Sequence, residues 1–203
     1  MRLSDNKREQ LSGVLKAAYR RLKYMPDQVL HRRRHLEARA RVRRLGLVRS
    51  ILVVCYGNVC RSPYLQAVLA RALPLVNVIS AGFVGPDRPV PAHSLTLAAS
   101  RGLDLSAFRS RPLARVNARE VDLVIVMDSA QRSHVARVFG VSPARIIVAG
   151  DLDPEPSATR AIADPWGKSL EAFAESFDRL DRCAATISTI IQYPHPSSLT
   201  PSP

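Results

Sequence analysis

A loop held between an expected strand and an expected helix constrains the fold of this chain more than any other feature. Four aliphatic residues, Ile51–Val54, predict a short strand buried in a parallel sheet. The loop that follows, residues 55–63, reads CYGNVCRSP. After it, apolar residues spaced three and four apart over residues 64–73 predict a helix. Strand, tight loop and helix in this order are typical of α/β proteins with a parallel sheet.

The residue types in this loop predict an anion site that contains a nucleophile. Gly57 allows a tight turn that can bring backbone N–H groups together, and the next helix adds its positive dipole end. Arg61 offers a planar fork for phosphate oxygens. Cys55 stands beside this positive field, which favours the thiolate. The competing interpretation is a buried strand cysteine and a surface arginine, and no Gly-Lys-Ser/Thr follows the loop to suggest a nucleotide cradle.

The chain's positive charge is concentrated at its start. The formal net charge is +13, from 30 Lys or Arg and 17 Asp or Glu in 203 residues. Residues 1–49 hold 15 of those basic residues and only 4 of the acidic ones, whereas residues 50–203 are nearly neutral. This step in charge predicts a boundary near residue 49.

The basic segment is expected to be helical. One apolar stripe lies within residues 11–22, Pro26 interrupts it, and a second Arg-dense helix is expected over residues 27–44, with Gly46 as its stop. Three functions stay open for residues 1–49. They are a solvated extension packed on the main domain, a helix that docks on a membrane surface or an acidic partner, and, ranked last, a nucleic-acid contact. An Arg-rich transit peptide is a further alternative.

Composition excludes several classes of protein. The sequence contains no run of 18 apolar residues, so no membrane span is expected. The first 30 residues contain no apolar block, so no secretory signal is expected. Three cysteines are too few for a disulfide scaffold and favour a reducing compartment. The histidines show no metal-ligand spacing, so no metal site is expected.

The motifs together resemble those of the low-molecular-weight protein-tyrosine phosphatase family. The loop at residues 54–63 is very close to that family's signature. The similarity continues through Ser80-Ala81-Gly82 after a second expected strand, through further strands expected within residues 121–127 and 145–148, and through Ala163-Asp164-Pro165-Trp166-Gly167. It covers about residues 50–192, and its second motif is closer to bacterial members.

This resemblance implies a role for each matching residue. Cys55 would be the nucleophile that forms a phosphocysteine, and Asp164 would protonate the leaving phenol and then activate water. Asn58 would brace the loop, hydrogen-bonded to Ser80, while Ser62 would stabilise the thiolate. The phosphoryl oxygens would be held by the loop residues Tyr56, Gly57, Asn58, Val59, Cys60 and Arg61.

The chemistry itself also requires an acid. A phenol with a pKa near 10 leaves more readily when it is protonated as it departs. Pro165 holds Asp164 in an extended setting, although an Asp-Pro pair also commonly caps a helix. Both functions of Asp164 are compatible, provided that its carboxyl group faces Cys55.

Three positions bear on specificity and regulation. By the resemblance, Cys60 could form a reversible disulfide with Cys55, although it could equally be a small apolar residue at the helix entry. Phe83 and Trp166 are candidates for the rim of the substrate pocket, and either could instead pack internally. Related arsenate reductases use two more cysteines in mid-chain, and residues 81–182 contain none, which argues against that activity.

We therefore expect a four-stranded parallel sheet with helices on both faces, flavodoxin-like, preceded by a helical extension. The expected units are residues 1–49, a phosphatase domain over residues 50–192, and a Pro/Ser-rich disordered tail over residues 193–203. The expected enzyme is cytoplasmic, uses no cofactor, and hydrolyses phosphotyrosine in proteins. By resemblance to bacterial members, a substrate could be a tyrosine kinase of surface-polysaccharide production. The alternative from another class is a binding module held on a membrane or an acidic partner by its basic arm.

Overall fold

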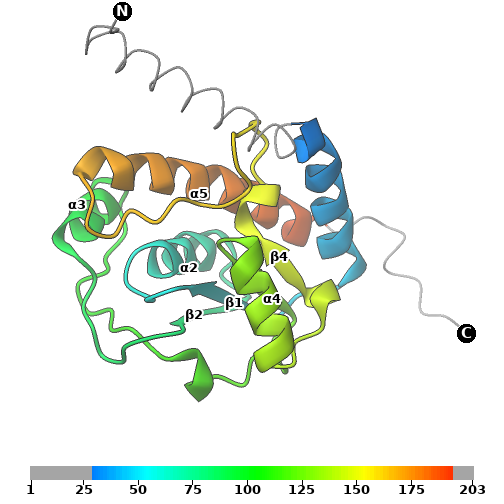
Figure 1. Cartoon of the computed structure of the whole chain (residues 1–203), viewed down its shortest axis with the longest axis horizontal. Coiled ribbons are helices and arrows are strands. Elements are labelled where there is room, and N and C mark those ends of the chain that lie inside the picture. The colour runs from blue at the N-terminus through cyan, green and yellow to red at the C-terminus, as the bar shows by residue number, and fades with distance from the viewer. Residues whose placement is uncertain (1–28, 194–203) are drawn as a thin grey trace, which may run out of the picture.

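The computed structural model describes residues 29–193, which form a four-stranded parallel sheet covered by helices on both faces (Figure 1). The strands are β1 (Ser50–Cys55), β2 (Asn77–Gly82), β3 (Leu123–Val126) and β4 (Ile146–Val148), in the spatial order β2-β1-β3-β4. The helices are α2 (Arg61–Ala72), α3 (Ala92–Ser100), α4 (Ser129–Val138) and α5 (Leu170–Gln192), with 3₁₀ turns at Leu113–Arg115, Pro143–Arg145 and Ala149–Asp151. The predicted fold class is confirmed.

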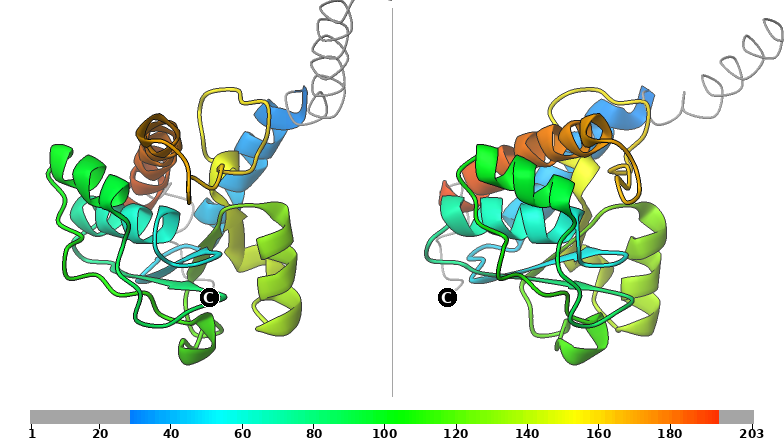
Figure 2. Two further views of the ribbon diagram at one scale, coloured as in Figure 1. Left: turned by 60° about the vertical axis from the view of Figure 1, so that its left-hand side comes forward. Right: turned by 90° about the vertical axis from the view of Figure 1, so that its left-hand side faces the viewer.

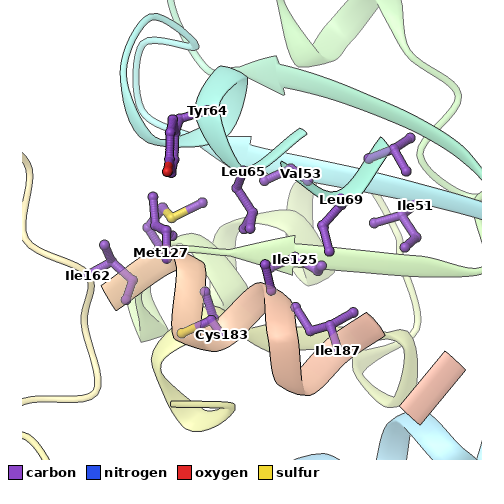
Figure 3. Packing of buried hydrophobic residues seen from close by; sticks show 14 of the residues in the cluster. Ile51, Val53, Tyr64, Leu65, Leu69, Ile125, Met127, Ile162, Cys183 and Ile187 are labelled. Atoms are coloured by element: carbon purple, nitrogen blue, oxygen red, sulfur yellow. The ribbon is translucent and has the colours of Figure 1, made fainter. Parts of the chain in front are cut away.

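Strict alternation along the buried strands divides the core into two layers. Ile51 and Val53 of β1 and Ile125 of β3 point to one face, where α2, α5 and the helix over residues 29–44 cover them. Leu52 and Val124 point to the other face, which α4 covers. Figure 3 shows the first layer, and Figure 2 shows how the helices are arranged around the sheet. Because both faces are covered, these strands are apolar at every position.

Contacts with α5 hold α2, the helix that follows the loop at residues 55–63, in place. The ring of Tyr64, at the start of α2, stacks on Phe177 of α5 with centroids 3.8 Å apart. Its hydroxyl donates to Asp181 Oδ1 at 2.7 Å, and Arg101 contacts both groups. The N-terminal end of α2 is therefore held against a 23-residue helix by an aromatic stack and a charged network.

The helix over residues 29–44 packs against the domain. Ala38 and Val42 are buried in the first core layer, and His35 Nδ1 donates to the carbonyl of Asp151 at 3.1 Å. The helix lies beside β4 and α5 (Figures 1 and 2). Gly46 follows it with a φ of 68°, as expected of a glycine that terminates a helix. The apolar stripe at residues 11–22 and nearly all of the Pro/Ser-rich tail lie outside the described residues.

The register of the sheet brings the ends of β1 and β2 together. Cys55 is paired with Gly82, the last residue of each strand. The carboxyl ends of parallel strands are the usual site of function in such sheets, and the loop at residues 55–63 leaves from this edge.

Candidate active site

The thiol of Cys55 lies under the loop that follows β1 and accepts two hydrogen bonds. The backbone N–H of Asn58 donates to Sγ at 3.2 Å, and the Ser62 hydroxyl donates at 3.0 Å. Both bonds stabilise the charged form of sulfur more than the neutral form, because a thiolate is the stronger acceptor. The predicted contact between Ser62 and the nucleophile position is present in the structure.

Asn58 braces this loop from inside the protein. It is fully buried with a φ of 51°, in the left-handed region, where asparagine is among the residues best tolerated. Its Nδ2 donates to Ser62 Oγ at 2.9 Å and to Ser80 Oγ at 2.8 Å, and its Oδ1 accepts the N–H of Arg111 at 2.8 Å. A continuous chain of hydrogen bonds thus links β2, the loop and the Cys55 thiol.

The two glycines at this edge admit close neighbours. A Cβ on Gly82 would lie 2.7 Å from the backbone nitrogen of Asn58, so β2 can approach the loop only without a side chain there. A Cβ on Gly57 would lie 2.8 Å from a guanidinium nitrogen of Arg88. The sequence predicts the tight turn at Gly57. In the structure the residue of this turn with left-handed backbone is Asn58 and not Gly57. The absence of a side chain at Gly57 instead leaves room for the guanidinium of Arg88.

Arg61, the first residue of α2, is buried and faces the acid predicted from sequence. Its Nη2 lies 2.5 Å from Asp164 Oδ2, and its Nη1 donates to the carbonyl of Ile162 at 2.9 Å. Its Nε is buried and has no hydrogen-bond partner in the described structure. The helix also lacks a side-chain cap at Cys60, so its first N–H groups and Arg61 Nε remain as donors for an anion.

Asp164 lies at the mouth of the site. Its side chain is 46% exposed, and its Oδ1 accepts the N–H of Trp166 at 3.3 Å, which is the Asp-Pro turn expected before the last helix. The sequence predicts that Asp164 faces Cys55. In the structure both residues line one pocket, and the carboxylate is paired with Arg61. An anion that takes over the Arg61 guanidinium would therefore release the carboxyl group.

The pocket above Cys55 has a cavity volume of about 130 Å³. Its lining comprises Cys55, Tyr56, Gly57, Val59, Cys60, Arg61, Val84, Arg88, Asp164 and Trp166. Trp166 is half-exposed at the rim, where the sequence predicts it. Asn58 and Ser80 stay beneath the pocket as supports.

Phe83 is not part of this rim, and its predicted position is wrong. Its ring packs edge-on against His134 at 5.0 Å and contacts Phe139, in the core layer under α4. The reason is that the side-chain alternation of β2 carries on to the residue after it, so that Ile79, Ala81 and Phe83 all pack in the layer under α4. Val84, the next residue, lines the pocket in its place.

Arg88 is a pocket residue that the sequence reasoning missed. Its guanidinium donates to the Gly57 carbonyl at 2.6 Å and to the Val84 carbonyl at 3.2 Å, so it ties the rim to the loop. A turn with positive φ at Gly85 and at Asp87 folds the chain back to place it there. The run Gly85-Pro86-Asp87 signals such a turn, but not which side chain the turn delivers.

The three cysteines are unpaired and differ in environment. Burial, together with the charges of Cys55 and Asp164, raises the pKa of Cys60 to about 12. Burial also raises the pKa of Cys183, whose side chain extends from α5 into the core. Both therefore remain thiols at neutral pH and are poor nucleophiles. No group of three metal-ligating side chains occurs among residues 29–193.

Comparisons with known proteins agree with this geometry. The chain is 35% identical over 139 residues to the low molecular weight protein-tyrosine-phosphatase Etp of Escherichia coli K12, covering 66% of this chain and 89% of Etp. The crystal structure of the tyrosine phosphatase amsI of Erwinia amylovora superposes with a TM-score of 0.67 at 28% identity, covering 72% of this chain and 95% of that one.

A second solved structure, Wzb of Vibrio vulnificus in complex with benzylphosphonate, superposes with a TM-score of 0.63 at 26% identity. The aligned region covers 70% of this chain and 98% of the Wzb chain. The sequence profile of the family described as low molecular weight phosphotyrosine protein phosphatase matches residues 50–193. This chain belongs to the low molecular weight phosphotyrosine protein phosphatase family.

Proposed function

We propose that this enzyme hydrolyses phosphotyrosine in proteins through a phosphocysteine at Cys55. The observation that carries the proposal is the environment of the Cys55 thiol. It accepts hydrogen bonds from Asn58 N–H and Ser62 Oγ at the floor of a pocket that Arg61 and Asp164 also line. A thiol, a guanidinium fork and a carboxyl group therefore line one cavity, which supports their proposed roles as nucleophile, oxyanion ligand and acid.

The first step is attack of the Cys55 thiolate on phosphorus. The S–P bond forms as the bond from phosphorus to the phenol oxygen breaks, and the electron pair of that bond passes to the phenol oxygen. Arg61 and the loop N–H groups hold the phosphoryl oxygens and replace the Arg61–Asp164 ion pair. Asp164, released from Arg61, takes up a proton from solvent and donates that proton to the departing phenol.

The second step returns the enzyme to its starting state. Asp164, now a carboxylate, accepts a proton from a water molecule that attacks phosphorus, and the S–P bond breaks with its electrons on sulfur. Inorganic phosphate leaves, Asp164 returns its proton to solvent, and Arg61 can pair with the carboxylate again. Water is the only co-reactant, and the proton that Asp164 takes from solvent before the first step is returned after the second.

The substrate is proposed from the shape of the pocket and from the relatives. Val84 and Trp166 give the mouth an apolar wall suited to an aromatic ring. Because several relatives are bacterial tyrosine phosphatases, we expect the substrate to be a phosphotyrosine protein, and a tyrosine kinase of surface-polysaccharide production is a specific candidate.

No helix within residues 29–193 combines the length and apolarity needed to cross a bilayer.

Hydrolysis of an aryl phosphate by the full chain tests this function directly. Cys55→Ser should lower kcat at least about 10⁴-fold, because serine is a far weaker nucleophile at this position. Cys183→Ala is the matched control, since it removes a core thiol that does not line the Cys55 pocket and should keep most of the activity. Equal activity in wild type and Cys55→Ser would overturn the proposal. Peptides carrying phosphotyrosine, phosphoserine or phosphoarginine would rank the substrate classes, the last because a solved arginine phosphatase shares the fold.

A further inference from the structure

A second arginine-lined cavity lies between the helix over residues 29–44 and the catalytic domain. Its volume is about 180 Å³, and it shares no lining residue with the Cys55 pocket. Four guanidinium groups come from three separate parts of the fold, and two carboxylates accompany them. The charged residues of its lining are Arg34, Glu37, Arg41, Arg132, Asp151 and Arg160.

Two of these arginines converge on one weak acceptor. Arg41 Nη1 lies 3.5 Å and Arg132 Nε lies 3.4 Å from the same carbonyl oxygen, that of Ile146 at the start of β4. Arg132 also donates to the Pro143 carbonyl at 3.1 Å. Neither guanidinium forms an ion pair within residues 29–193. Two like charges thus share one carbonyl at the outer limit of hydrogen-bond distance.

The nearby carboxylates are already engaged. Glu37 forms an ion pair with Arg33 at 2.7 Å on the exposed side of the helix. Asp151 accepts from Arg160 through both of its oxygens, one of them at 2.9 Å from Arg160 Nε. Burial, and then the charges of Arg41 and Arg160, lower the pKa of Arg132. Asp151 acts in the opposite direction and raises the pKa of Arg132, but the cavity lining still holds four guanidinium groups against two carboxylates, an excess of two positive charges.

We infer that this cavity binds a phosphate-class oxyanion, with the Arg41 and Arg132 side chains as its principal ligands. A planar guanidinium fork can donate two parallel hydrogen bonds to two oxygens of a phosphate group. The cavity has room for one phosphate or one diphosphate group. Arg41 lies on the helix over residues 29–44 and Arg132 lies on α4. A bound oxyanion would therefore connect the helix over residues 29–44 to α4. This inference does not depend on the proposed function.

Calorimetric titration of the full chain with inorganic pyrophosphate tests the site. Iodoacetate first blocks Cys55, and mass spectrometry checks for a single addition, so that the phosphate loop cannot contribute. Three proteins are compared: wild type, the site variant Arg41→Gln/Arg132→Gln, and the control Arg43→Gln/Arg137→Gln. The control removes the same charge from the same two helices at exposed positions.

Wild type and control should each bind one equivalent of pyrophosphate, and the site variant should bind at least tenfold more weakly. Equal affinity in all three proteins would overturn the site in favour of diffuse surface attraction, and so would no binding by wild type at millimolar pyrophosphate. Parallel titrations with inorganic phosphate and with ADP identify the source of the oxyanion. Tighter binding of ADP supports a nucleotide, and tighter binding of pyrophosphate supports a free anion.

A measurement on wild type alone covers the case in which the site variant does not fold. Pyrophosphate should shift the NMR signals of the Arg41 and Arg132 side-chain N–H groups and of backbone amides over residues 147–151. Shifts that spread over the exposed arginines and spare these two would contradict the site.

Discussion

The two arginine-lined cavities of this molecule differ in what accompanies the positive charge. In the Cys55 pocket one buried arginine, Arg61, lies beside a thiol and an uncapped helix end and forms an ion pair with Asp164. In the cavity under the N-terminal helix, guanidinium groups gather without a nucleophile or a helix N-terminus. The first arrangement can make and break a bond to phosphorus, whereas the second can only hold an anion. Local chemistry, and not the amount of charge, separates catalysis from binding.

The largest effect that sharpens this comparison is expected at Asp164. Asp164→Asn should lower kcat for phosphotyrosine by about 10² to 10⁴-fold, because the amide cannot protonate the leaving phenol. An aryl phosphate whose phenol is more acidic should lose less, since it needs less protonation. Steady-state kinetics on both substrates gives the ratio, with Glu171→Gln, an exposed acid at the start of α5, as the control. An equal loss on both substrates would assign Asp164 a positioning role only.

A smaller effect on stability is expected where arginines are balanced by a carboxylate. Asp153 is fully buried and pairs with Arg179 at 3.0 Å and with Arg182 at 2.9 Å. Asp153→Asn should lower the free energy of unfolding by about 3 kcal/mol, because it removes the buried counter-charge of Arg179 and the nearer of the two acids that pair with Arg182. Glu155→Gln removes an exposed partner of Arg182 and should cost about 0.5 kcal/mol or less. Urea denaturation measures both, and equal costs would contradict the account.

The pH dependence of stability provides a second readout for the same carboxylate. Burial alone would raise the pKa of Asp153, but the arginine contacts outweigh it, and its pKa lies below the usual 3.8. The folded state therefore holds this proton less tightly than the unfolded chain. The stabilisation is present above pH 3.8 and is lost as the pH falls through the lower, folded value. The Asp153→Asn variant should lack this part of the acid sensitivity.

The smallest effect is expected at the rim. Arg88→Gln removes the donor to the Gly57 carbonyl and should lower kcat/KM by roughly tenfold, in line with one lost charged hydrogen bond of about 1.5 kcal/mol. Arg109→Gln is the matched control, because Arg109 also donates only to backbone carbonyls, on an exposed turn. Steady-state kinetics on an aryl phosphate compares the two. If both variants behave alike, Arg88 is not a positioning residue of the loop.

The parts of the fold and site that could be predicted are those encoded by local pattern. The aliphatic run at residues 51–54 predicted β1, and the family resemblance predicted the other three strands. The residues within 55–63 predicted the loop, because tight turns and anion sites need particular residues at particular offsets. The hydrogen bond between Asn58 and Ser80 could also be expected, since the family resemblance placed both residues in the motif.

The parts that could not be predicted depend on contacts between distant segments. Phe83 packs against His134 and Phe139, and Arg88 reaches Gly57 only through a turn with two residues at positive φ. The Arg88 contact leaves no periodic signal, and the side on which Phe83 lies follows from alternation only once the strand is known to end at Gly82. The proximity of Arg41 and Arg132 could not be predicted either, because they lie 91 positions apart in the sequence. Only the packing of the helix over residues 29–44 on the rest of the fold brings both side chains to the Ile146 carbonyl.

The identity of the phosphorylated atom tests the central claim most directly. The Asp164→Asn variant, which should release phosphate slowly, is mixed with an aryl phosphate, quenched in acid within a turnover and digested for mass spectrometry. One phosphoryl group is expected on the peptide that contains Cys55. It should still be present in Cys60→Ser/Asp164→Asn and absent in Cys55→Ser/Asp164→Asn. A phosphoryl group on any other residue, or steady turnover without a phosphorylated enzyme, would contradict it.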